Sequence, residues 1–156
     1  MKEIRGFTLN VLNDLIKTSK DEYFLLELAS RKSGDTKLKS LFANYAFAKK
    51  EHIIKLGAEI QRLGGYSETN KDDLEISIEF YESSFFEENQ NGILAECLKK
   101  DNLTILRYFA AIRKNIMWEV VPLVAKQYFE CKNFHDQIEN ICMEKPGRLI
   151  QKMGIH

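Results

Sequence analysis

Apolar residues recur every three or four positions along most of the chain, which is the spacing that places them on one face of an α-helix. The first stripe predicts a helix from about residue 4 to residue 30, and it contains Leu9, Leu12, Leu15, Ile16, Ser19, Tyr23, Leu26 and Ser30. The second contains Leu38, Leu41, Phe42, Tyr45, Lys49, His52, Leu56, Ile60 and Leu63. Asp35 is placed to cap this second helix, and Gly64-Gly65 is placed to end it.

Two further stripes follow in the second half of the chain. One predicts a helix from about residue 92 to residue 114, with Leu94, Cys97, Leu98, Asp101, Ile105, Tyr108, Phe109 and Ile112 on its buried face. The other contains Val120, Val124, Tyr128, Cys131, His135, Ile138 and Cys142. Pro122 suits the first turn of this last helix, and Pro146-Gly147 is expected to end it. We therefore expect a single domain over residues 1–145 and a tail over residues 146–156.

Residues 66–91 form a long acidic connection, with eight Asp or Glu residues against Lys71. Its apolar residues alternate as in a strand at Leu74, Ile76, Ile78 and Phe80, or repeat as in a helix at Leu74, Ile78, Tyr81 and Phe85. Because a single strand would have no partner elsewhere in the chain, we favour a short helix. Two helical hairpins joined by such a crossover form an all-α four-helix bundle, as in ferritin-like folds.

Composition narrows the classes of function. The chain has 156 residues and a formal net charge of zero, which disfavours binding to nucleic acid through a broad basic face. No apolar run approaches the roughly 20 residues that cross a bilayer. Asp14 and Lys17 interrupt what would be the apolar part of a signal peptide, so we expect a cytoplasmic protein. The three cysteines, Cys97, Cys131 and Cys142, are then expected to be reduced core residues. A redox or metal role for Cys97 and Cys131 is the alternative.

Several short segments, in order, carry a family resemblance. They are Leu9–Ile16, Asp35–Phe42 and Leu63–Gly65, followed by Glu96-Cys97, Asp101, Tyr108, Gln127 and His135-Asp136. Together they resemble the bacterial ferritin-like family known as domain of unknown function 2383. The resemblance implies a ferritin-like fold and no established activity. The chain departs from the family at Asp101, where members tend to have Glu, and at Glu79–Glu82, where they tend to have a basic and aromatic run.

A complete di-iron centre is not expected from this sequence. Such a centre in a ferritin-like bundle uses a Glu-x-x-His pair from each of two helices. Here the residue three positions before His52 is Lys49, and the residue three positions before His135 is Lys132.

Three polar residues nevertheless lie on the apolar stripes, namely His52, Asp101 and His135. A buried Asp101 requires a partner, and helix heights place His135 within its reach. We favour a hydrogen bond between Asp101 and an imidazole, with Ser19, Tyr23, Tyr45 and Tyr108 as further members of a polar layer. The alternative is a single-metal site in which His52, Asp101 and His135 bind iron or another divalent metal.

Charged residues near the stripes, and apolar residues away from them, give the remaining expectations. We expect Lys49 to extend its amine out of the core, and Glu22 and Glu27 to be solvated. Apolar residues outside the stripes require a second cover: Val11, Phe24, Leu25 and Leu28 in the first helix, and Leu103 and Leu106 in the third. We expect the acidic segment to cover one set and a homodimer contact to cover the other. The aromatic residues of segment 66–91 could instead recognise a protein partner.

Motifs typical of many enzymes are absent, since the sequence has no Gly-rich phosphate loop, no G-x-S-x-G and no Cys-x-x-Cys. We therefore favour a helical bundle that works by binding or assembly. The alternative is a metal-binding protein with oxidase or storage chemistry.

Overall fold

The computed structural model describes residues 2–67 and 90–144, and this part of the chain contains four helices and no strand. They are α1 (Lys2–Lys32), α2 (Thr36–Arg62), α4 (Gln90–Arg113) and α5 (Val121–Glu144). The all-α bundle and its four long helices are thus confirmed, with bounds close to those predicted from the stripes. The short helix expected within residues 66–91 and the tail from residue 146 fall outside the described residues.

The ends of α2 use the capping residues that the sequence predicts. The Asp35 side chain accepts a hydrogen bond of 3.0 Å from the backbone N–H of Leu38, which satisfies a donor in the first turn. Gly64 follows the helix with φ of +79°, a conformation that L side chains adopt at a cost. The Gly65 N–H donates a hydrogen bond to the carbonyl of Ile60, which satisfies an acceptor in the last turn of α2.

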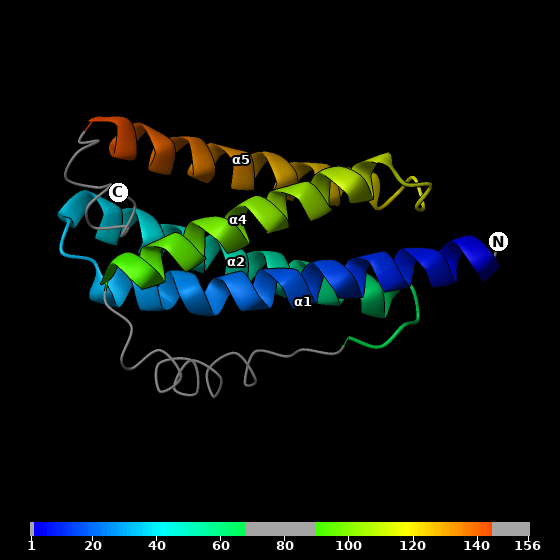
Figure 1. The fold of residues 1–156 in the computed structure, drawn as a ribbon. Coiled ribbons are helices and arrows are strands. Elements are labelled where there is room, and N and C mark those ends of the chain that lie inside the picture. Colours follow the sequence, from blue (N-terminus) through cyan, green and yellow to red (C-terminus); the bar gives the residue numbers. More distant parts are fainter. Residues whose placement is uncertain (1, 68–89, 145–156) are drawn as a thin grey trace.

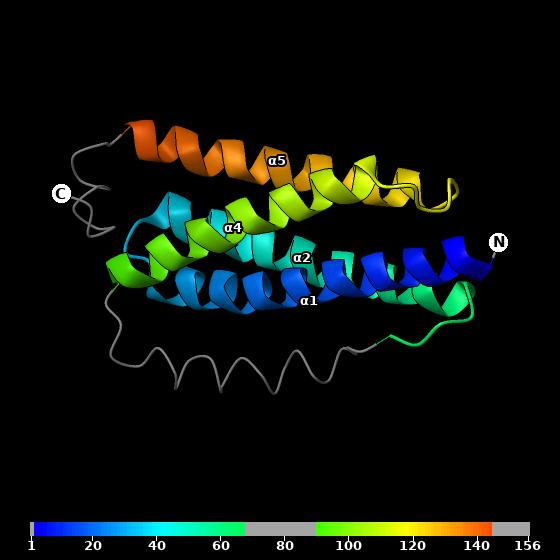
Figure 2. The same ribbon diagram turned by 45° about the vertical axis from the view of Figure 1, so that its right-hand side comes forward.

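Each helix packs against two neighbours, and the order around the bundle is α1, α2, α5, α4. Both ribbon views show that every helix runs antiparallel to the two beside it (Figure 1 and Figure 2). As a result α2 ends at one end of the bundle, whereas α4 begins at the opposite end. The start of α1 lies at the same end as the loop between α4 and α5, where Thr8 Oγ1 accepts a hydrogen bond of 3.0 Å from the backbone N–H of Met117.

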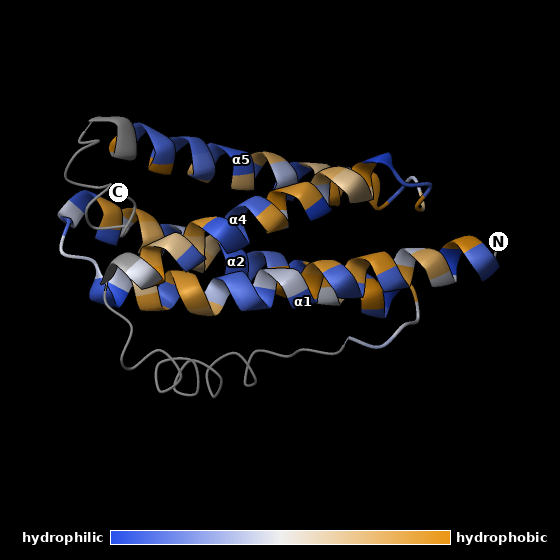
Figure 3. Cartoon of the chain, viewed as in Figure 1, coloured by the Kyte–Doolittle hydropathy of each residue, from blue (hydrophilic) through white to orange (hydrophobic). Residues whose placement is uncertain are grey.

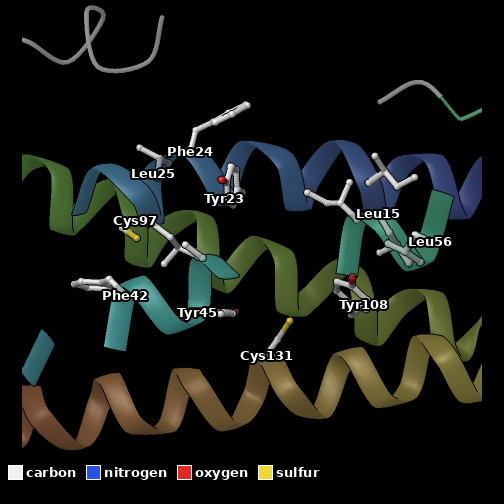
Figure 4. Packing of buried hydrophobic residues seen from close by; sticks show 14 of the residues in the cluster. Leu15, Tyr23, Phe24, Leu25, Phe42, Tyr45, Leu56, Cys97, Tyr108 and Cys131 are labelled. Atoms are coloured by element: carbon white, nitrogen blue, oxygen red, sulfur yellow. The ribbon is translucent and has the colours of Figure 1, made fainter. Parts of the chain in front are cut away.

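Helix α1 is the most deeply buried of the four. Its predicted stripe faces the core, and Val11, Phe24, Leu25 and Leu28 outside that stripe are at most 5% exposed. Figure 4 shows Leu15, Tyr23 and Leu25 of α1 among the packed core residues. The expectation that the acidic segment covers part of this helix depends on residues 68–89, which the structure does not describe. In contrast, Leu103 and Leu106 of α4 are exposed, as predicted.

Helix α5 is less apolar than α1. Among the side chains that the structure describes, it buries Val124, Gln127, Cys131 and Ile138. The visible turns of its C-terminal half are mostly hydrophilic (Figure 3). Polar contacts therefore contribute much of the attachment of α5 to the bundle. No helix in the described ranges combines the length and the apolar content needed to cross a bilayer.

Candidate functional site

A buried polar cluster, to which every helix contributes, occupies the centre of the bundle. We define the central cluster as Glu22 of α1, Tyr45 and Lys49 of α2, Asp101 of α4, and Cys131 and His135 of α5. All except His135 are at most 1% exposed, and the His135 side chain is 12% exposed. Polar groups withdrawn from water to this extent are costly unless they bind one another, so their contacts define the site.

Asp101 is the acceptor that links α2 to α5. Its Oδ1 accepts a hydrogen bond of 2.5 Å from the Tyr45 hydroxyl, and its Oδ2 lies 2.7 Å from His135 Nδ1. The pairing of Asp101 with an imidazole and with a Tyr hydroxyl, expected from the sequence, is therefore present. On its outer side His135 Nε2 lies 3.1 Å from Glu139 Oε1, whose side chain is 61% exposed. This series of contacts joins the centre of the bundle to the solvent.

The two members of the Asp101–His135 pair stabilise each other's charge. Burial raises the pKa of Asp101, but the hydrogen bonds from His135 and Tyr45 and the charge of Lys49 lower it, and the net shift is downward. The hydrogen bond to Asp101 raises the pKa of His135, and burial opposes this effect only in part. The arrangement favours an ionised carboxylate beside an imidazolium.

Lys49 lies inside the core, so the expectation that its amine leaves the core is wrong. Its Nζ is 3.1 Å from Glu22 Oε1 and 3.0 Å from Cys131 Sγ, and both Lys49 and Glu22 are fully buried. The amine also lies 5.3 Å from the ring centroids of Tyr45 and Tyr108. Burial alone lowers the pKa of Lys49, but the neighbouring Cys131 sulfur and the Glu22 carboxylate raise it by more, and the amine is an ammonium in the resting protein.

Glu22 is also buried, contrary to the expectation that it would be solvated. Neither of its carboxyl oxygens accepts a hydrogen bond. Burial raises the pKa of Glu22 well above its ordinary value, Lys49 opposes this, and the charge of Asp101 adds to it. The Glu22 carboxylate is therefore stabilised by the Lys49 ammonium 3.1 Å away, and it binds a proton more readily than an ordinary glutamate.

His52 belongs to a separate network, one turn of α2 beyond Lys49. Its Nε2 lies 3.2 Å from Glu130 Oε2, and its backbone carbonyl accepts a hydrogen bond of 3.3 Å from Gln127. Gln127 in turn accepts a hydrogen bond of 2.6 Å from the Tyr108 hydroxyl, which lies 3.4 Å from Ser19 Oγ. Burial, followed by the charge of Lys49, lowers the pKa of His52 to about 3, so the imidazole is neutral at ordinary pH.

The structure thus brings together two of the three residues predicted as metal ligands. Asp101 and His135 are paired, whereas His52 is hydrogen-bonded within the other network. In the part of the chain that the structure describes, no three His, Cys, Asp or Glu residues are arranged to hold a metal ion. The residue types present can store and pass protons, because two carboxyl groups, an imidazole and a phenol form successive contacts.

The Glu22–Lys49 ion pair is the feature that the sequence interpretation missed. A signal for it was available, because Lys49 lies on the apolar stripe of α2 and a buried ammonium requires a counter-charge. Glu22 follows Ser19 by three positions, which places the two side chains on the same face of α1. Two of the three cysteines expected in the core are confirmed, since Cys97 and Cys131 are free and buried. The side chain of Cys142 lies outside the described residues.

Comparison with known proteins gives one assignment. No curated protein matches the sequence. A family model described as Domain of unknown function (DUF2383) matches residues 8–114. The matched region includes Glu22, Tyr45, Lys49 and Asp101, whereas Cys131 and His135 of α5 lie beyond it. Because the match covers more than half of the chain, this protein belongs to the DUF2383 family.

Proposed function

We propose that this protein is a ferritin-like bundle that works by binding or assembly rather than by catalysis, and that a buried ammonium takes the place of a metal at its centre. The observation that carries the proposal is the position of Lys49 Nζ, 3.1 Å from Glu22 and 3.0 Å from Cys131. We place the protein in the cytoplasm, where cysteines stay reduced.

The ferritin-like assignment is supported by the order and direction of the helices. Two antiparallel hairpins, α1–α2 and α4–α5, are connected from one end of the bundle to the other. One long crossover between two hairpins is the connectivity of ferritin-like bundles. The central cluster lies between the four helices, and ferritin-like bundles likewise build their metal sites from side chains on facing helices.

Electrostatics favours the ammonium over a metal in this cluster. A divalent cation near Asp101 and Glu22 would lie close to Lys49, and repulsion between cations is strong in a water-poor interior. The competing function remains metal binding by His52, Asp101 and His135. It requires His52 to leave Glu130, and it requires further ligands from water or substrate.

Thermal melts with and without metal separate the two functions. The tag-free protein, Asp101→Asn and His135→Asn would each be melted with Fe(II), Mn(II) or Zn(II). We expect no metal to raise the melting temperature of the wild type. A rise in the wild type that is lost in both variants would overturn the proposal, because a ligand that binds the folded state stabilises it. Asp136→Asn, on an exposed position of α5, is the matched control.

A double-variant cycle tests the ammonium itself. Lys49→Met leaves Glu22 buried without its counter-charge, and loss of one partner of a buried ion pair costs about 3 to 5 kcal/mol. Adding Glu22→Leu removes the unpaired group, and we expect most of the loss to be recovered. Urea unfolding measures both steps. A Lys49→Met variant as stable as the wild type would contradict a central role for the ammonium.

The proposed assembly uses the exposed apolar face of α4. Leu103, Leu106 and Phe109 are 39%, 64% and 43% exposed, and Phe129 of the neighbouring α5 is 66% exposed. Phe109 lies 6.0 Å from the ring of Tyr128, so this face continues from α4 to α5. We propose that a second copy of the chain packs here, because clustered apolar side chains on a small protein usually mark a contact surface.

A further inference from the structure

We propose that Lys49 and Cys131 form a reversible covalent bond between Nζ and Sγ when the protein meets hydrogen peroxide. Such a bond would join α2 to α5 across the centre of the bundle. The inference concerns a modification site, and it does not depend on whether the protein works by assembly.

The geometry brings the two reacting atoms together. Lys49 Nζ and Cys131 Sγ are 3.0 Å apart, and both residues are completely buried. Figure 4 shows Cys131 reaching from α5 into the bundle, between the positions of Tyr45 and Tyr108. The rings of these two tyrosines lie 5.3 Å from the amine. Fixed neighbours at this distance favour reaction with each other over reaction with an outside thiol.

The reaction proceeds in two balanced steps. Hydrogen peroxide first oxidises the Cys131 thiol to a sulfenic acid and is reduced to one water molecule. The Lys49 nitrogen then attacks Sγ, the S–O bond breaks, and the departing hydroxide takes a proton from the nitrogen to form a second water. Sulfur loses two electrons overall and peroxide gains them. A sulfenic acid condenses in the same way with backbone nitrogen.

Glu22 is placed to prepare the amine for attack. A protonated Lys49 is not nucleophilic, so its extra proton must first move to a neighbouring base. Glu22 Oε1 lies 3.1 Å from Lys49 Nζ, and neither Glu22 oxygen accepts a hydrogen bond. Because burial favours the neutral form of this carboxyl group, Glu22 is the base that takes that proton as the amine attacks.

Oxidation of Cys131 requires α5 to open locally, so that peroxide reaches the thiol. A buried thiol in a rigid core is inert, and the pKa of Cys131 is raised by burial although Lys49 opposes this. However, α5 is held partly by polar contacts, including those of Gln127, Glu130 and His135. Elements held in this way open locally more readily than the apolar core. Reclosure after oxidation places the sulfenic acid beside the amine.

Mass spectrometry of the intact chain tests the proposal. The folded wild type would be treated with hydrogen peroxide and digested without reducing agent. We expect a peptide pair joined through Lys49 and Cys131 that lacks two hydrogen atoms, and its separation by dithiothreitol. Cys131 that stays a thiol, or that accumulates only as sulfinic acid, would overturn the proposal, as would a cross-link to a different lysine.

Variants and a denatured control make the test specific. Cys97→Ser should keep the cross-link, since Cys97 has no part in it, whereas Lys49→Arg should lose it while retaining a cationic side chain at this position. The wild type in urea should also lose it, because the two atoms are then no longer neighbours. Equal yields in the folded and the denatured protein would show that the bond does not depend on the geometry of the central cluster.

Discussion

Asp101 is the residue whose replacement most directly tests the polar centre. Asp101→Asn keeps an oxygen that can accept from the Tyr45 hydroxyl, so we expect a small loss of stability. Asp101→Leu leaves Tyr45 and His135 without their buried acceptor and should cost about 1 to 3 kcal/mol. Urea unfolding of both variants measures the difference. Equal losses would mean that the charge of Asp101, rather than its hydrogen bonds, stabilises the fold.

His135 should make the protein less stable as the pH rises. Its folded pKa lies above the unfolded value of about 6.5, so its contribution is complete below that pH and is lost as the pH rises through the folded pKa. His135→Asn should remove this part of the pH dependence. Unfolding curves of the two proteins on both sides of pH 6.5 provide the test, and parallel profiles would contradict the assignment.

His52 should act in the opposite direction. Its pKa is lowered to about 3, so the unfolded chain binds a proton first as the pH falls. The protein therefore loses stability between roughly pH 6.5 and the folded pKa. We expect His52→Asn to weaken this acid sensitivity, measured by urea unfolding at a series of acidic pH values. An unchanged acid profile would mean that His52 is protonated in the folded protein.

The sequence predicts some of these residues better than others. The Asp101–His135 contact could be predicted because both residues lie in the middle of a stripe and at similar heights along antiparallel helices. The Glu22–Lys49 pair could not be placed in the same way, since helical periodicity gives the direction of a side chain and not what lies opposite it. Glu22 lies at the edge of its stripe, and only the packing of all four helices buries it.

At the scale of elements, the end of α2 offers a paired glycine test. Gly64 has φ of +79°, so Gly64→Ala should destabilise the protein by about 1 to 2 kcal/mol. Gly6 lies within α1 with no atom within 4 Å of an added Cβ, so Gly6→Ala should stabilise by up to about 1 kcal/mol. Thermal unfolding compares the two. A neutral Gly64→Ala would show that the helix can end in another conformation.

The helix bounds were the most predictable part of the fold. A long stripe predicts the bounds of a helix well when capping or helix-breaking residues stand at its ends. Here Asp35, Gly64 and Pro122 mark ends that the structure confirms. The secondary structure of residues 66–91 could not be assigned from the pattern alone, because their apolar residues fit the strand period of two and the helix period of 3.6 equally well. Tertiary packing, rather than local pattern, decides such segments.

For the whole molecule, we expect a dimer built on the outer face of α4. Light scattering should give about twice the chain mass of 18.2 kDa. Leu106→Glu places a charge in the proposed contact and should yield monomers. Phe47→Glu, on the exposed side of α2, is the matched control and should leave the dimer intact. A wild type that stays monomeric at high concentration would remove this proposal.

The alternation of helix directions also determines the electric field that the helix backbones produce inside the bundle. Each helix carries a macrodipole with its positive end at the N-terminus, and every neighbour here points the other way. The axial fields of α1 and α5 therefore oppose those of α2 and α4 at mid-length, near Glu22 and Asp101. The backbone therefore adds little net electrostatic potential there. Protonation in the central cluster depends on which side chains are in contact, and a single substitution can change which of them holds a proton.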